Sequence, residues 1–291
     1  MKFKSRNTLN VLVVLTVLLI ILGCVCPNDR TDGTDTNSPA ANEQTSDDSD
    51  ETKPGKEPDK GDFIVRQTSV ADPRYESLDR SLKESKVLEK AADKLNRSLS
   101  LPHDITLQTK DCGQVNAFYD PQDKSITFCY ELMEHFFQLY RSDGDSVDEA
   151  NKRMNEAVTF IFLHELGHAL IDSYDLPITA NQEDAADRCS SYICIEELGE
   201  DGVQAILSAA DAFAIESKDR TPNQRSMADE HLLQEQRFFN SLCMVYGSNQ
   251  GKYSYIVEKG YLPKERAVRC PSEYDQTARA WVKLLEPWRK D

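Results

Sequence analysis

Residues 160–168 read FIFLHELGH, and the rest of the sequence is best interpreted outward from this stretch. His164 and His168 are four positions apart, so on a helix they project from one face, one turn apart. Both imidazoles can then reach one metal ion, and Glu165 can reach a water on that ion without binding the metal itself. The apolar neighbours indicate a buried helix. The stretch therefore predicts a metal centre on a core helix; the alternative is a chance match on an ordinary core helix.

An acidic cluster follows, where the sequence EDAAD begins at Glu183. A catalytic zinc usually has three protein ligands and one open position, so a third ligand is needed. Glu183 and Asp187 share one face of a predicted helix over 181–198, whereas Asp184 has no partner carboxylate on its own face. We expect Glu183 to bind one Zn²⁺ per chain and Asp187 to accept the second N–H of a ligand histidine. The alternative is an acidic helix start near the favourable end of its dipole.

The remaining periodicity predicts an α+β fold, with a small sheet early and helices afterwards. Strands are expected at 104–109, 114–119 and 124–130, the last returning after an Asp-Pro turn. Helices are expected at 81–100, 131–141, 148–172, 181–198, 201–215, 224–246 and 273–286.

The composition limits the classes of function. The chain has 291 residues and a formal net charge of −16. A surface that negative repels phosphate backbones, so sequence-independent nucleic-acid binding is excluded.

The N-terminus has the pattern of an export signal. Basic residues precede an apolar run from Val11 to Leu22, which is short for a transmembrane helix. Gly23-Cys24 follows and resembles the end of a lipobox, although Leu22 is an unusual residue at its position in that pattern. We expect residues 1–24 to be a signal peptide whose Cys24 is lipidated; an uncleaved membrane anchor is the alternative. Either would place the protein outside the cytoplasm, on the outer face of the cell membrane.

Residues 25–62 are expected to be a disordered acidic tether. From residue 28 onward this segment has eleven acidic residues against four basic ones, and no large apolar residue. Such a segment cannot bury enough apolar surface to offset the entropy lost on ordering. The folded domain is therefore expected at 63–291.

Six cysteines lie in the expected domain, and an oxidising compartment permits them to pair. Fifteen connectivities exist if all six pair. Cys112 and Cys129 flank a turn between extended segments, so a bridge between them is our first expectation, and Cys243 with Cys270 is the second. Cys189 and Cys194 lie five apart on a predicted helix, which is poor geometry for a mutual bridge.

The order His-Glu-x-x-His and then Glu-x-x-Ala-Asp resembles the gluzincin branch of zinc metallopeptidases, and within it an uncharacterised metallopeptidase family. Further likeness lies in the segments CG at 112, NAFYDP at 116, CYEL at 129, QRFFN at 236 and RC at 269. The resemblance covers most of residues 100–290. It implies a zincin-like fold, with a small twisted sheet over the HExxH helix and a mainly helical C-terminal part.

The resemblance also implies roles for residues outside the zinc motifs. Asn116, Ala117 and Tyr119 match an Asn-Ala-aromatic edge strand that holds an extended peptide substrate by its backbone; an ordinary interior strand is the alternative. His231 would stabilise the oxyanion of the tetrahedral intermediate. Tyr246 and Tyr119 are rival donors for that task, and His231 could instead be a packed or surface histidine.

These expectations combine into a membrane-tethered, extracytoplasmic zinc peptidase that hydrolyses peptide bonds through a metal-activated water, with Glu165 as general base. Two other classes remain open. One is a non-catalytic zinc- or peptide-binding surface lipoprotein, although such a protein would not need Glu165. The other is an interaction protein that docks through its acidic domain.

Overall fold

The computed structural model describes residues 55–290, except residues 180, 219–221 and 224–227. The expected signal peptide, Cys24 and most of the expected tether lie outside the described residues. Residues 57–62 lie on the domain, because the amide groups of Glu57 and Lys60 donate to the carbonyl oxygens of Pro287 and Leu101. The sequence-based boundary at residue 63 is therefore several residues later than the first of these contacts. None of the described helices is long and apolar enough to cross a membrane.

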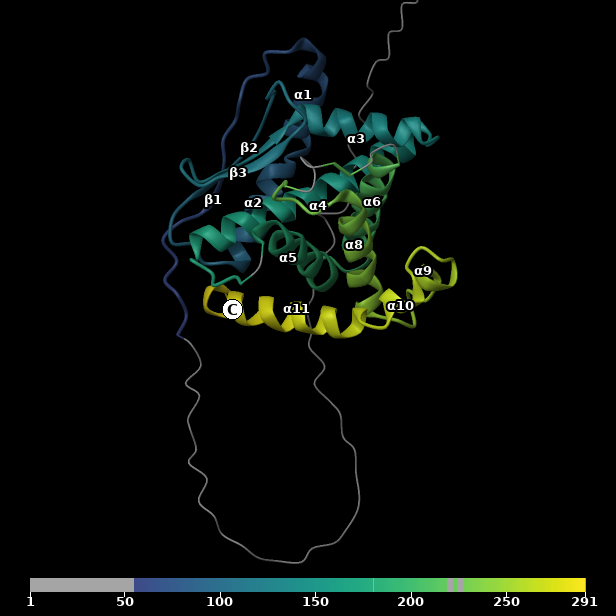
Figure 1. Ribbon diagram of the computed structural model, residues 1–291. Coiled ribbons are helices and arrows are strands. Elements are labelled where there is room, and N and C mark those ends of the chain that lie inside the picture. The colour runs from purple at the N-terminus through teal and green to yellow at the C-terminus, as the bar shows by residue number, and fades with distance from the viewer. Residues whose placement is uncertain (1–54, 180, 219–221, 224–227, 291) are drawn as a thin grey trace, which may run out of the picture.

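The expected α+β class is confirmed, with a small mixed sheet and a mostly helical remainder (Figure 1). The strands are β1 (Phe63–Val65), β2 (Ile105–Lys110), β3 (Ala117–Asp120) and β4 (Ser125–Cys129). The longer helices are α1 (Glu76–Ser85), α2 (Val87–Ser98), α3 (Tyr130–Ser142), α4 (Val147–Ser173), α5 (Gln182–Glu197), α6 (Gly199–Ser217), α8 (Gln234–Ser248) and α11 (Cys270–Leu285). Short helical turns are η2 (Pro73–Tyr75), α9 (Tyr255–Glu258), α10 (Lys264–Ala267) and η3 (Glu286–Trp288).

The four strands have the order β1-β2-β4-β3, with β3 antiparallel to the rest. Alternate residues of β2 and β4, among them Leu107 and Phe128, are apolar and buried. Phe128 contacts Phe162 of α4, so this face of the sheet packs on the long helix. One edge of the sheet is formed by β1 and is covered by α2, where the side chain of Asn96 accepts the amide of Phe63 and donates to its carbonyl. Strand β3 is left as an edge beside α4.

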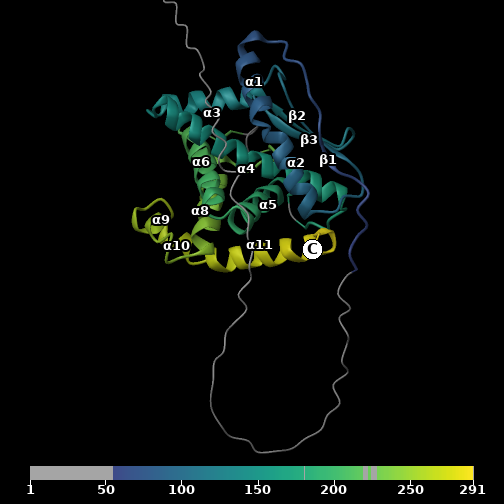
Figure 2. The same ribbon diagram turned by 180° about the vertical axis from the view of Figure 1, so that it is seen from behind.

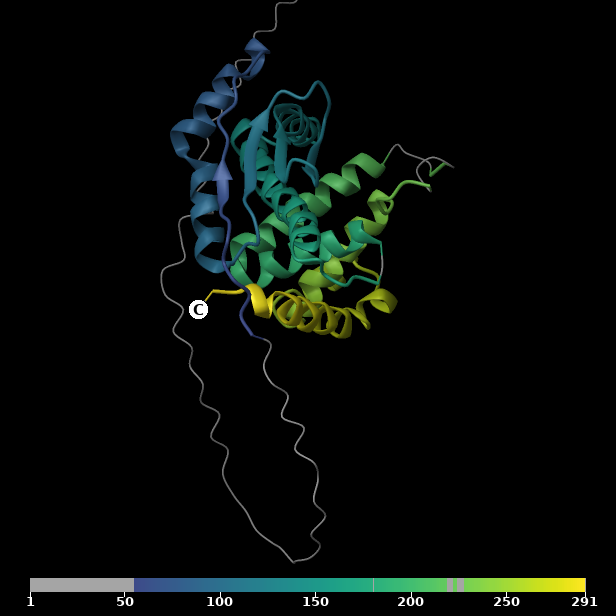
Figure 3. The ribbon, with the colours of Figure 1, turned by 90° about the vertical axis from the view of Figure 1, so that its left-hand side faces the viewer.

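Figure 3 shows the arrangement from the side: α1 and α2 lie beside the strands on one side, and α6, α8 and α11 lie on the other. Figure 2 shows from behind that α11 runs along one end of the helical part, below α5 and α8. Helices α5, α6 and α8 contact one another, and α4 contacts both α5 and α6. The long helix is thus surrounded, as its apolar sequence indicates.

Three sequence-based elements differ from the structure. The single helix expected at 81–100 is two helices, because Lys86 has a left-handed backbone (φ 54°) and interrupts the ladder. Strand β1 is only three residues long and gave no periodic signal. The helix expected from 224 begins at residue 234, so His231 lies in the preceding loop and not on a helix.

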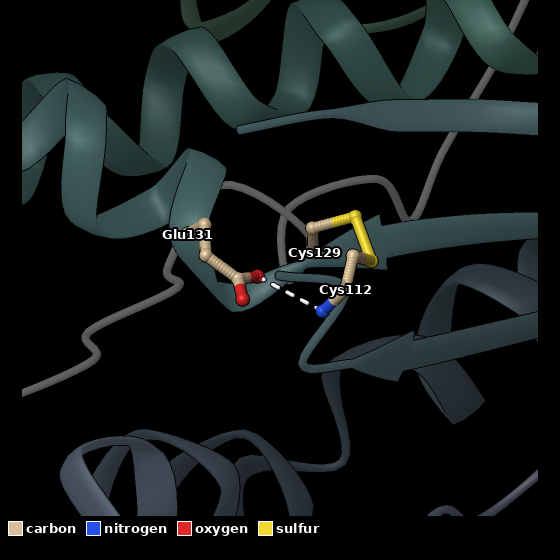
Figure 4. Close-up of side chains that lie close together, drawn as sticks. All are labelled: Cys112, Cys129 and Glu131. Carbon is tan, nitrogen blue, oxygen red and sulfur yellow. Dashed lines mark hydrogen bonds between the residues drawn. A yellow bond between two sulfur atoms is a disulfide. The ribbon is translucent and has the colours of Figure 1, made fainter. Parts of the chain in front are cut away.

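Both expected disulfides are confirmed. Cys112–Cys129 joins the segment after β2 to the end of β4, and Cys243–Cys270 joins α8 to α11. Cys189 and Cys194 are free, buried thiols, as expected. In Figure 4 the carboxylate of Glu131 lies beside the first bridge and accepts the amide of Cys112. The three residues are close enough to suggest a metal site, but both sulfurs are used in the bridge, so they supply no thiolate ligands.

Candidate metal centre

Helix α4 provides the base of the site because it is long, capped and buried. Its first turn begins at Ser146, whose hydroxyl accepts the amide of Glu149, and acidic residues follow at the positive end of the dipole. The helix continues for 27 residues through the core. His164 is only 3% exposed, so its position is determined by packing.

The two motif histidines converge as the spacing predicts. The Nε2 atoms of His164 and His168 are 3.1 Å apart, with the rings edge to face. Each Nε2 atom points toward the next helix, α5. The histidine pair therefore presents two nitrogen donors at one point.

Glu183, at the start of α5, brings a carboxylate to the same point. Its Oε2 atom lies 3.1 Å from Nε2 of His164 and 3.4 Å from Nε2 of His168. The start of α5 is held by Asn181, whose side chain accepts the amide of Glu183. The ligand atoms of His164, His168 and Glu183 all lie within 4.8 Å of one another. The geometry thus brings together the three residues proposed from the sequence.

This donor set fits a divalent metal ion such as zinc. Two imidazole nitrogens and one carboxylate oxygen are a usual set for a catalytic zinc with an open position. The Oε2 atom of Glu183 is buried and accepts no hydrogen bond among the described residues, and a bound cation would satisfy it. Burial raises the pKa of Glu183, but the surrounding imidazoles outweigh burial and hold that pKa well below its usual range. Glu183 therefore stays ionised, as a ligand must.

Each motif histidine is oriented through its second ring nitrogen. Nδ1 of His164 lies 2.8 Å from Oδ1 of Asp187, as expected from the sequence. Nδ1 of His168 lies 2.7 Å from Oε1 of Gln182, a partner that was not expected from the sequence. One histidine is thus supported by a carboxylate and the other by a neutral amide. Such partners fix the tautomer and ring orientation of a metal-binding histidine.

Arg237 of α8 completes the support behind His164. Its Nε and Nη2 atoms each lie 2.8 Å from an oxygen of Asp187, and its guanidinium stacks 4.1 Å from the ring of Phe213. Arg237 is buried (8% exposed). Burial raises the pKa of Asp187, but the guanidinium of Arg237 and the ring of His164 lower this pKa by a larger amount. The carboxylate therefore remains charged. Arg237 stood within a segment noted for its family resemblance, but nothing local to that segment indicated this role.

Glu165 lies beside the histidine pair and faces the edge strand. Its Oε2 atom accepts the backbone amide of Tyr119 at 2.9 Å. The side chain is 7% exposed, and burial raises its pKa. A carboxylate with a raised pKa beside a metal centre can accept a proton and later release it.

Strand β3 presents a backbone edge next to Glu165 that pairs with no other described strand. The carbonyl of Asn116 accepts the amide of Cys129, and hydrogen-bonded pairs alternate along an antiparallel ladder. The backbone groups of Ala117 and Tyr119 therefore point away from β4, as the bond from Tyr119 to Glu165 shows. The hydroxyl of Tyr119 donates to Asp172 at 2.6 Å, which leaves it unsuited to the oxyanion role considered for it.

His231 reaches the cluster from the loop before α8. Its Nε2 atom lies 3.0 Å from Oε2 of Glu183, and its ring stacks with His164 at 6.2 Å between centroids. Nδ1 of His231 contacts Asp229 at 3.1 Å, and the side chain is 49% exposed. Thus a third imidazole, partly open to solvent, faces the same carboxylate oxygen.

Comparison with known proteins gives one match. A model of the family described as "Putative metallopeptidase" matches residues 68–285, about three quarters of the chain. No curated protein and no solved structure matches. The matched region contains every residue of the cluster described above.

Proposed function

The chain belongs to this metallopeptidase family, and from that premise we propose that it is a zinc-dependent peptidase of the gluzincin type with a zincin-like fold. The observation that carries the proposal is the convergence of His164, His168 and Glu183 within 4.8 Å, with Glu165 directly beside them. A structural zinc site would be closed by four ligands and would not need an adjacent buried carboxylate.

In this mechanism His164, His168 and Glu183 would hold the zinc. A zinc ion bound there would polarise the scissile carbonyl and lower the pKa of a coordinated water toward about 7. Glu165 accepts the proton of the attacking water and then delivers it to the leaving amine. Asp187 holds His164 in one tautomer, and Arg237 holds Asp187 ionised.

The substrate is proposed to lie along β3. An extended peptide can add to a free strand edge through its backbone, which holds the scissile bond straight across the site. The outward-facing backbone groups of Ala117 support this placement, and Asn116 lies at the start of the same edge. His231, half exposed beside Glu183, is proposed to donate to the oxyanion.

We further propose that the peptidase acts outside the cytoplasm, attached to the membrane through a lipid on Cys24 and the acidic tether. Two disulfides among the described residues support an oxidising compartment. Peptides or proteins outside the cytoplasm would be its substrates.

A non-catalytic zinc-binding lipoprotein is the second candidate, and the position of His231 favours it. Nε2 of His231 lies 3.0 Å from the Oε2 atom of Glu183 but outside the group of ligand atoms within 4.8 Å of one another; a shift toward the two motif histidines would make it a fourth protein ligand and close the site to water. The two candidates therefore differ in what His231 does.

Two variants decide between them. For a peptidase, Glu165→Gln should retain one zinc per chain and lose about 10²–10⁴-fold in kcat on a peptide library. His231→Ala should lower kcat while zinc affinity stays within a few-fold of wild type. For a closed site, His231→Ala should release zinc readily, and the wild-type chain should hydrolyse no peptide. Elemental analysis and zinc competition titration measure the metal; mass spectrometry of cleaved peptides measures the activity.

A further inference from the structure

A cavity of about 310 Å³ lies on the side of α4 that faces away from the metal cluster. Val158, Phe162, Leu166 and Leu170 line it, and their spacing of four residues puts them on one face of the helix. Helices α1 and α2 form the opposite wall, and the end of α5 and the C-terminal residues form one end. Neither His164 nor His168 lines this space.

The cavity is apolar and has the size of a single alkyl chain. Its volume of about 310 Å³ holds about ten groups of the volume of a water molecule, ~30 Å³ each. That is at the lower end of the range for small-molecule pockets. A chain of about ten carbons would fit, whereas a lipid with two longer chains would not. Apolar surroundings of this kind favour an alkyl ligand over water.

The charged residues around the cavity are mostly basic, although the chain as a whole carries −16. Arg289 pairs with Glu197, Lys290 pairs with Asp59, and Arg97 lies near Asp93. Of the basic residues that line the cavity, Lys94 is the one that forms no ion pair with a described residue.

The environment of Lys94 is unfavourable for a cation without a counter-ion. The side chain is half-buried against the apolar lining. Burial lowers the pKa of Lys94, and the charge of Glu197 offsets this only in part. A carboxylate placed in the cavity beside the ammonium group would supply the missing counter-ion.

We propose that this cavity binds a fatty acid of about ten carbons, with its chain between α2 and α4 and its carboxylate paired with Lys94. The apolar lining selects the alkyl chain, and the lysine selects an anion over a neutral amphiphile. The site is separate from the metal cluster and does not depend on the proposed peptidase activity.

The test uses the full chain in nanodiscs of zwitterionic lipid, with decanoate labelled with ¹³C at the carboxyl group. Carbon NMR follows the bound carboxylate as a signal distinct from free and lipid-partitioned decanoate. Decanol serves as the neutral ligand of equal length. We expect one saturable decanoate per chain, in the presence or absence of zinc and in Glu165→Gln as in wild type.

Lys94→Met should weaken decanoate binding at least tenfold and leave decanol binding within twofold. The matched control is Lys90→Met, one turn earlier on α2, where the lysine is exposed and does not line the cavity; it should change neither. Val158→Phe should fill the cavity and remove both ligands, with its melting temperature reporting whether it is folded. Absence of saturable decanoate binding, or equal affinity in wild type and Lys94→Met, would overturn the proposal. Loss of peptidase activity alone would leave it unaffected.

Discussion

Replacing Arg237 by methionine should destabilise the chain and weaken its metal site together. The guanidinium is buried and makes two 2.8 Å bonds to Asp187, so its removal leaves this carboxylate with the His164 imidazole as its remaining side-chain partner and without its full counter-charge. Breaking a buried ion pair from one side costs about 3–5 kcal/mol. Asp187 in turn orients His164, so zinc affinity should also fall, by about 10–100-fold as for other changes behind metal ligands.

Urea unfolding of the metal-free protein measures the first effect, and zinc competition titration the second. Arg237→Lys keeps the charge but cannot bind both oxygens of Asp187 in a bidentate way. Its stability and zinc affinity should therefore lie between those of wild type and Arg237→Met. The matched control is Arg188→Met, since Arg188 pairs with Asp184 on the more exposed side of α5 and should cost less than about 1 kcal/mol.

A double-mutant cycle tests whether the Arg237–Asp187 ion pair is the cause of the lost stability. In a protein that already carries Asp187→Asn, Arg237→Met should lower the free energy of unfolding by less than it does in the wild-type protein. The expected coupling energy between the two residues is about 0.5–3 kcal/mol. Additive costs, or an Arg237→Met cost no larger than that of Arg188→Met, would refute the claim that this ion pair supports the site.

Three other substitutions test the third zinc ligand, one disulfide and the membrane attachment. Glu183→Ala should lose zinc readily while Asp184→Ala keeps it; an essential Asp184 with a dispensable Glu183 would make the ligand assignment wrong. Removing the Cys112–Cys129 bridge, which closes a sequence separation of 17 residues, should lower the free energy of unfolding by about 3 kcal/mol in urea titrations. Cys24→Ala should release the protein from membranes in fractionation, whereas continued attachment with an intact N-terminus would favour an uncleaved anchor.

The features that could be predicted from the sequence are those formed by residues that lie close together in it. The histidine spacing, the acidic pair of the next helix and the cysteines flanking a turn all depend on local geometry, and each lies where expected. Features made by distant segments were missed. Arg237 lies fifty positions after Asp187, and nothing around either residue identifies the other.

Two other errors have local causes. The break at Lys86 has no glycine or proline to mark it, because a lysine occupies the left-handed position. The apolar and charged periodicity on both sides continues, so one helix was expected. The segment around His231 was expected to be helical for the same reason, but there the carboxylate of Asp229 accepts the backbone amide of His231 and contacts its ring.

One residue inside the histidine motif links the local pattern to the three-dimensional site. A β-carbon added at Gly167 would lie 3.1 Å from the α-carbon of Ala186 and 3.1 Å from the β-carbon of Cys189. Helices α4 and α5 are therefore in backbone contact there, which only small residues permit. A larger residue at 167 would push α5 outward by a few tenths of an ångström or more, and with it the carboxylate of Glu183 that faces both imidazoles. Gly167 therefore helps to set the distance between the third ligand and the two histidines.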